Sequence, residues 1–200
     1  MDTPIGSKKA DLVYKNTPQR DLMLTFLPPT NKKYDDAPVY FIIPGGHLAL
    51  MVAYAPEELF SSDYEFCDKF SAKVVAPMSP PTILYDGLTH NLDNELNKAF
   101  SDCDSKEERK KTSPITYVSK SCPPTLLCAG TSDYLVFANS SERLFEKLTE
   151  CNISCELRLS IGGGHCFEKI HSTIEPSINM EEMQNSITDF ILQYMEKNND

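Results

Sequence analysis

The apolar positions in the N-terminal quarter of the chain predict a hairpin, a buried strand and a helix. Residues 11–15 and 21–27 alternate between apolar and polar, and the polar T-P-Q-R between them is typical of an antiparallel pair. Residues 39–43 form a continuous apolar run, which is typical of a strand buried on both faces of a parallel sheet. A helix is expected over 47–54, entered from two glycines.

The rest of the chain alternates between strand and helix patterns. Residues 72–78 and 125–129 are short apolar runs that end in turn residues, and 155–161 alternates. Helical spacing of apolar residues covers 137–148 and 180–194. This order predicts an α/β domain with a mostly parallel sheet, flanking helices and the N-terminal antiparallel hairpin.

Length and charge narrow the class of protein. Two hundred residues suit a single domain over 1–200, with 101–112 as a polar, exposed insertion containing the helical K-E-E-R-K-K. The net charge of −10 argues against nucleic acid or an anionic membrane as partner. We expect a cytoplasmic protein, because the start lacks an apolar signal region and no segment reaches 18 consecutive apolar residues.

The cysteines indicate neither a disulfide framework nor a metal site. There are seven, an odd number without framework spacing, and Cys151 and Cys155 have no second pair to complete a zinc site. Free thiols in a reducing compartment are expected. We predict no metal and no cofactor.

Two loops after predicted strands carry candidate chemistry. The strand at 125–129 is followed by G-T-S-D, which ends in Asp133, and the strand at 155–161 by G-G-G-H, which ends in His165. The carboxyl ends of parallel strands share one sheet edge, and the glycines allow a sharp turn that brings the imidazole over it. An aspartate there is often only a turn former, and Gly-His pairs are common. Together, however, the acid and the histidine can form a hydrogen-bonded pair that orients the second imidazole nitrogen toward a nucleophile.

Longer stretches around these residues resemble the α/β-hydrolase family, in its carboxylesterase and acetyl-esterase (lipase-like) branch. The resemblance rests on S-P-I-T-Y-V-S-K-S-C-P-P-T-L-L-C-A-G-T-S-D-Y-L-V, on L-F-E-K-L-T-E-C-N-I-S-C-E-L-R-L-S-I-G-G-G-H-C-F, and on D-L-V-Y-K with a following L-P-P. It implies that Asp133 is the acid and His165 the base of a catalytic triad. It also implies a small acyl ester as substrate or ligand.

The chain departs from that family at the nucleophile. The family carries its serine on a G-x-S-x-G elbow and often reads S-A-G-G-H-L-A-L, whereas this chain reads F-I-I-P-G-G-H-L-A-L. Ile43 therefore stands in the place of the serine. The same letters also resemble the oxyanion loop of an earlier strand, with Gly45 and Gly46 as its glycines. We interpret 43–47 as a seam where an internal deletion of roughly 60–80 residues removed two helix-plus-strand units and the elbow.

Three functions remain open for such a chain. It is an esterase-family protein with impaired or absent activity, an active short-chain esterase with an unrecognised nucleophile, or a non-catalytic module that binds a small ligand. Ser79 lies at the correct sheet edge, but the prolines after it forbid the helix that follows an elbow. His47, His90 and His171 are interpreted as surface residues. A shortened sheet of about six strands also favours self-association through an exposed edge.

Overall fold

The computed structural model describes residues 10–16, 21–26, 45–56, 59, 72–93 and 105–196. The chain divides into two compact units, the first formed by Met1–Phe41 with Glu57–Glu65 and the second by Ile42–Pro56 with Phe66–Asp200. The predicted strand at 39–43, including Ile43, lies outside the described residues. The single domain over 1–200 stays a prediction.

The first unit contains two antiparallel strands, β1 (Ala10–Asn16) and β2 (Asp21–Phe26). Ala10 lies opposite Phe26, and the register shifts between Val13 and Lys15, as in a β-bulge. The strands follow the two alternating runs of the sequence, and four residues of the chain separate the end of β1 from the start of β2.

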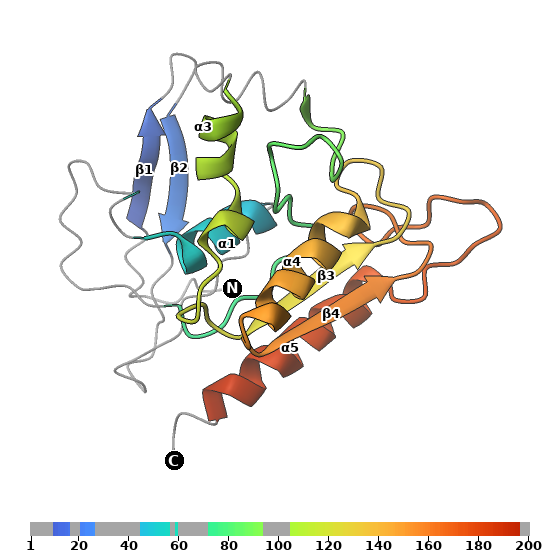
Figure 1. The fold of residues 1–200 in the computed structure, drawn as a ribbon. Coiled ribbons are helices and arrows are strands. Elements are labelled where there is room, and N and C mark those ends of the chain that lie inside the picture. The colour runs from blue at the N-terminus through green and yellow to red at the C-terminus, as the bar shows by residue number, and fades with distance from the viewer. Residues whose placement is uncertain are drawn as a thin grey trace. The chain divides into compact units, whose positions relative to one another are not determined.

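The second unit is built on a parallel pair of strands, β3 (Thr125–Gly130) and β4 (Cys155–Ser160), with Thr125 opposite Cys155 (Figure 1). The segment 72–78 lies along the other edge of β3, through parallel bridges from Val75 to Thr125 and from Met78 to Cys128. Every residue of β3 is buried between these neighbours. The predicted α/β architecture with a parallel sheet is therefore confirmed, and the figure of six strands stays a prediction.

Helices cover both faces of this sheet. Alternate side chains of β3 point to opposite faces, so the strand packs against different helices on its two sides. Leu127 packs with apolar residues of α1 (Gly46–Tyr54) and α4 (Ala138–Glu150). Leu126 and Cys128 pack instead with α5 (Met180–Glu196). The apolar spacing of each helix sequence accounts for the side it buries, as with Leu144 and Leu148 of α4 and with Met183, Ile187, Phe190 and Ile191 of α5.

The polar stretch before β3 forms a short helix, α3 (Lys106–Lys111), followed by the 3-10 turn η2 (Pro114–Tyr117). Ser105 and Glu108 form a capping box at the start of α3, with the Glu108 N–H donating to the Ser105 hydroxyl. None of its six residues is buried, as expected for a solvated helical K-E-E-R-K-K. Within the described ranges, no helix is both long enough and apolar enough to cross a membrane.

Candidate acid–base site

Asp133 follows the carboxyl end of β3 and is held by its own turn. Its backbone N–H donates to the Gly130 carbonyl at 3.3 Å, and its side chain is fully buried. One carboxylate oxygen, Oδ1, accepts the backbone N–H groups of Leu135 at 2.9 Å and Val136 at 3.0 Å. The residue is thus a turn former in the ordinary sense. Its second oxygen remains available for another partner.

That partner is His165, which follows the glycine run after β4. Its Nδ1 lies 2.7 Å from Oδ2 of Asp133, and 36% of the His165 side chain is exposed. The hydrogen bond from Nδ1 to Asp133 raises the pKa of His165 against the opposing effect of burial, with further help from the charges of Asp133 and Glu168. In the neutral imidazole that donates from Nδ1, the lone pair belongs to Nε2. The arrangement therefore holds a base with one nitrogen fixed and the other free to accept a proton.

The two strand-end turns are joined by hydrogen bonds. The Thr131 N–H donates to the Ser160 carbonyl at 3.0 Å, and the Ser132 N–H donates to the Gly163 carbonyl at 2.9 Å. A third bond runs from the Gly162 N–H to the Thr131 hydroxyl at 2.8 Å. Gly162 has φ +79, a conformation that glycine adopts at little cost. The two predicted site residues thus lie together, and their catalytic roles stay predictions.

The glycine pair at the predicted seam begins α1. Gly45 is the residue before the helix, and Gly46 lies against the end of segment 72–78, where an added β-carbon would be 2.7 Å from the Met78 carbonyl oxygen. The amino end of α1 therefore lies beside Ser79, the residue after Met78. The role of Gly45 and Gly46 as an oxyanion loop stays a prediction, and Ile43 lies outside the described residues.

Two histidines interpreted as surface residues are not free on the surface. His90 is only 2% exposed, and its Nδ1 accepts the Leu92 N–H at 3.3 Å. Burial lowers the pKa of His90, although Asp93 and Asp86 act in the opposite direction. His47 is partly buried, and its Nδ1 donates to the Pro81 carbonyl at 3.0 Å. The placement of His90 and His47 on the surface was therefore wrong.

His90 is buried because its segment pairs with a distant part of the chain, which the local sequence pattern does not predict. Its segment forms an antiparallel bridge to Val136, and the Asn91 N–H donates to the Leu135 carbonyl at 2.7 Å. These partners lie just after Asp133, more than 40 residues further along the chain. The polar stretch D-G-L-T-H-N-L-D alone gave no sign of the contact.

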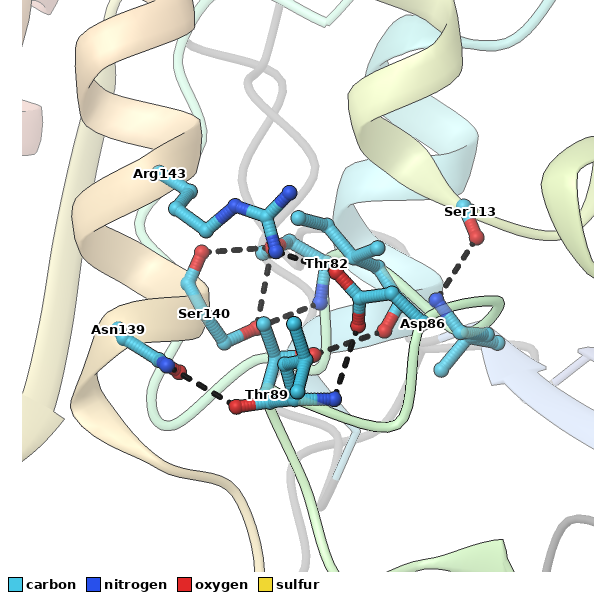
Figure 2. A network of polar contacts seen from close by, with 10 residues as sticks. Thr82, Asp86, Thr89, Ser113, Asn139, Ser140 and Arg143 are labelled. Atoms are coloured by element: carbon cyan, nitrogen blue, oxygen red, sulfur yellow. Dashed lines mark hydrogen bonds and ion pairs between the residues drawn. The ribbon is translucent and has the colours of Figure 1, made fainter.

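The loop over 82–91, which contains His90, contacts α4 through side-chain hydrogen bonds and an ion pair (Figure 2). Ser140 accepts the Thr82 N–H at 2.9 Å, and Arg143 forms an ion pair with Asp86. Asn139 donates from its amide to the Leu88 carbonyl at 3.0 Å. The loop over 82–91 is thereby fixed between α4 and the turn that carries Asp133.

Sequence comparison gives the family. Residues 31–148 match BD-FAE, an α/β-hydrolase-like family, so the chain belongs to it. The match includes the glycine pair and Asp133 and ends before His165. No curated protein matches the chain.

Solved structures share the fold at low sequence identity. An esterase from the Planctomycetes species Thermogutta terrifontis, with propionate bound, is 20% identical, with a TM-score of 0.56 over 74% of this chain and 52% of that one. A truncated carbohydrate esterase from gut microbiota is 17% identical, with a TM-score of 0.57 over 75% of this chain and 56% of that one. The chain thus spans about half the length of these proteins.

Proposed function

We propose that this chain is a protein of the carboxylic-ester hydrolase type that keeps the acid and base of a catalytic triad but lacks its nucleophile. Activity on esters is accordingly absent or severely impaired. The proposal rests on the 2.7 Å contact between His165 Nδ1 and Asp133 Oδ2, in a chain whose sequence has Ile43 where the family has serine.

The geometry suits general-base chemistry at Nε2 of His165. Asp133 is buried and fixed through Oδ1, so its Oδ2 can hold the imidazole in the tautomer that leaves Nε2 unprotonated. Asp133 also stabilises the imidazolium that forms when Nε2 accepts a proton, which agrees with the raised pKa of His165. The proton donor in the family mechanism is the elbow serine.

Without that serine, no acyl-enzyme forms by the family route. In a well-studied protease, an oxyanion hole and substrate binding alone keep a residual advantage of about 10³–10⁴-fold over water. Here we assign such a hole to the Gly46 and His47 N–H groups at the start of α1, because the Leu48 and Ala49 N–H groups donate to the Gly45 carbonyl. A slow, non-covalent hydrolysis is the most activity that these parts support.

The ligand class that we propose is suggested by the ligands of proteins with a similar fold. Structures of the Thermogutta terrifontis esterase are described with propionate bound and with butyrate bound. We propose that a short acyl group is also the ligand of this chain, at the site formed by Asp133 and His165.

Rapid-mixing hydrolysis of p-nitrophenyl acetate tests the proposal. A covalent acyl-enzyme gives a burst of p-nitrophenol equal to the protein concentration, and we expect no burst. Any slow steady rate should fall in His165→Ala and Asp133→Ala and persist in His171→Ala, which changes an exposed histidine. A stoichiometric burst that disappears in His165→Ala would show that a nucleophile is present.

A further inference from the structure

Ser79 has a left-handed backbone conformation, which is unusual for a residue other than glycine. It follows segment 72–78, and its N–H donates to the Cys128 carbonyl of β3 at 2.8 Å. Its φ is +42, in a region that residues other than glycine rarely adopt, and it is only 4% exposed. Such a conformation persists only where the surroundings hold it, and it often marks a functional position.

The Ser79 hydroxyl contacts the residue that carries the base. It donates to the backbone carbonyl of His165 at 2.8 Å, across 86 residues of sequence. His165 is therefore held at two points, its imidazole by Asp133 and its carbonyl by Ser79. The two contacts come from the ends of neighbouring parallel segments.

The residues around Ser79 are themselves fixed. The Pro80 carbonyl accepts the Ser140 hydroxyl at 3.0 Å, and the Pro81 carbonyl accepts Nδ1 of His47 at 3.0 Å. On the other side, Gly46 packs against Met78. Ser79 therefore joins the histidine loop to a frame formed by α1, α4 and the sheet.

We propose that Ser79 is a positioning residue: its left-handed backbone directs the hydroxyl to the His165 carbonyl and so sets the imidazole against Asp133. This role goes beyond the proposed function, and it holds whether or not the chain turns over an ester. The other role for this serine is that of a replacement nucleophile. The structure favours positioning, because the hydroxyl proton is donated to a carbonyl oxygen and two prolines follow in place of an elbow helix.

The test is NMR of the His165 imidazole in the 200-residue chain. Ser79→Ala and Ser79→Gly remove the hydroxyl, and in both we expect the pKa of His165 to fall toward its ordinary value of 6.5. The Nδ1 proton should also exchange faster with solvent. Ser79→Gly should melt at a higher temperature than Ser79→Ala, because glycine tolerates the positive φ. Ser79→Thr keeps the hydroxyl and should keep the His165 pKa, while melting at a lower temperature than wild type.

Ser113→Ala is the matched control. The buried Ser113 hydroxyl accepts the Leu84 N–H at 2.9 Å and donates to the Arg109 carbonyl at 2.7 Å, without contact to the histidine loop. This variant should lose stability without changing the His165 pKa. The proposal is overturned if Ser79→Ala and Ser79→Gly leave that pKa unchanged, if Ser113→Ala shifts it equally, or if a fluorophosphonate labels Ser79. Labelling of a different serine would instead contradict the proposed function and leave the role of Ser79 standing.

Discussion

Gly130, the last residue of β3, lies directly against the backbone of Gly164. A β-carbon at position 130 would be 2.2 Å from the Gly164 carbonyl oxygen and 2.3 Å from that of Gly163. Real side chains do not tolerate such distances, so only glycine allows the histidine loop to rest on the end of the acid-bearing strand. Asp133 lies three residues after Gly130, and His165 directly follows Gly164. The approach of these glycines therefore sets the distance between acid and base.

Gly130→Ala should destabilise the fold and disturb the acid–base pair. We expect a cost of about 3 kcal/mol in unfolding free energy, the upper end for inserting a methyl group into a packed interior, because backbone must shift. Gly87→Ala is the control, since Gly87 has φ +66 and no atom within 4 Å of an added β-carbon. Strain alone should then cost about 1 kcal/mol. Urea denaturation measures both, and equal costs would contradict the close approach at Gly130.

The pair of Asp133 and His165 should make stability depend on pH. Because the pKa of His165 is raised in the folded state, the pair stabilises fully below 6.5, and the effect is lost as pH rises through the folded pKa. Asp133→Asn removes the charge and keeps an oxygen for the N–H groups of Leu135 and Val136. The difference in unfolding free energy between wild type and Asp133→Asn should therefore be larger at pH 6 than at pH 9. A difference that does not vary with pH would argue against the pair.

His90 should show the opposite dependence on pH. Its pKa is lowered by burial, so the unfolded chain binds a proton more readily, and stability falls as pH drops below 6.5. Protonation also places an N–H where Nδ1 now accepts the Leu92 N–H. His90→Gln removes the titration, so the stability of wild type relative to this variant should decrease between pH 8 and pH 5. Thermal melts across that range check it, and an increase would show that the sign is wrong.

Two adjacent buried serines of α4, Ser140 and Ser141, allow a matched comparison of alanine variants. The buried Ser140 hydroxyl accepts the Thr82 N–H and donates to the Pro80 carbonyl, whereas the Ser141 hydroxyl is buried with no hydrogen-bond partner. Ser140→Ala leaves buried polar groups unsatisfied and should cost about 1–3 kcal/mol. Ser141→Ala should stay within about 0.5 kcal/mol of wild type or stabilise it. Comparable losses by chemical denaturation in the two variants would refute the network in Figure 2.

Local sequence patterns predicted the helices that bury one regular face and the strands that form short apolar or alternating runs. Residues 47–54, 137–148 and 180–194 correspond to α1, α4 and α5, and the runs at 125–129 and 155–161 correspond to β3 and β4. The meeting of acid and histidine followed from the rule that parallel strands end at one edge.

The features that sequence reasoning missed depend on distant partners. His90 is buried by residues that follow Asp133, and the left-handed backbone of Ser79 is held by β3 and the histidine loop. Neither position carries a glycine or a periodic pattern that would mark it. In both cases the tertiary contact decides the local conformation.

The central claim, an acid–base pair without its nucleophile, is tested most directly by labelling with a fluorophosphonate probe, followed by mass spectrometry of the modified peptide. Such a probe reacts with serines that a neighbouring base activates. We predict no stoichiometric modification of any serine in wild type, and no difference between wild type and His165→Ala. Stoichiometric labelling of one serine, abolished in both His165→Ala and Asp133→Ala, would contradict the account and establish a complete triad.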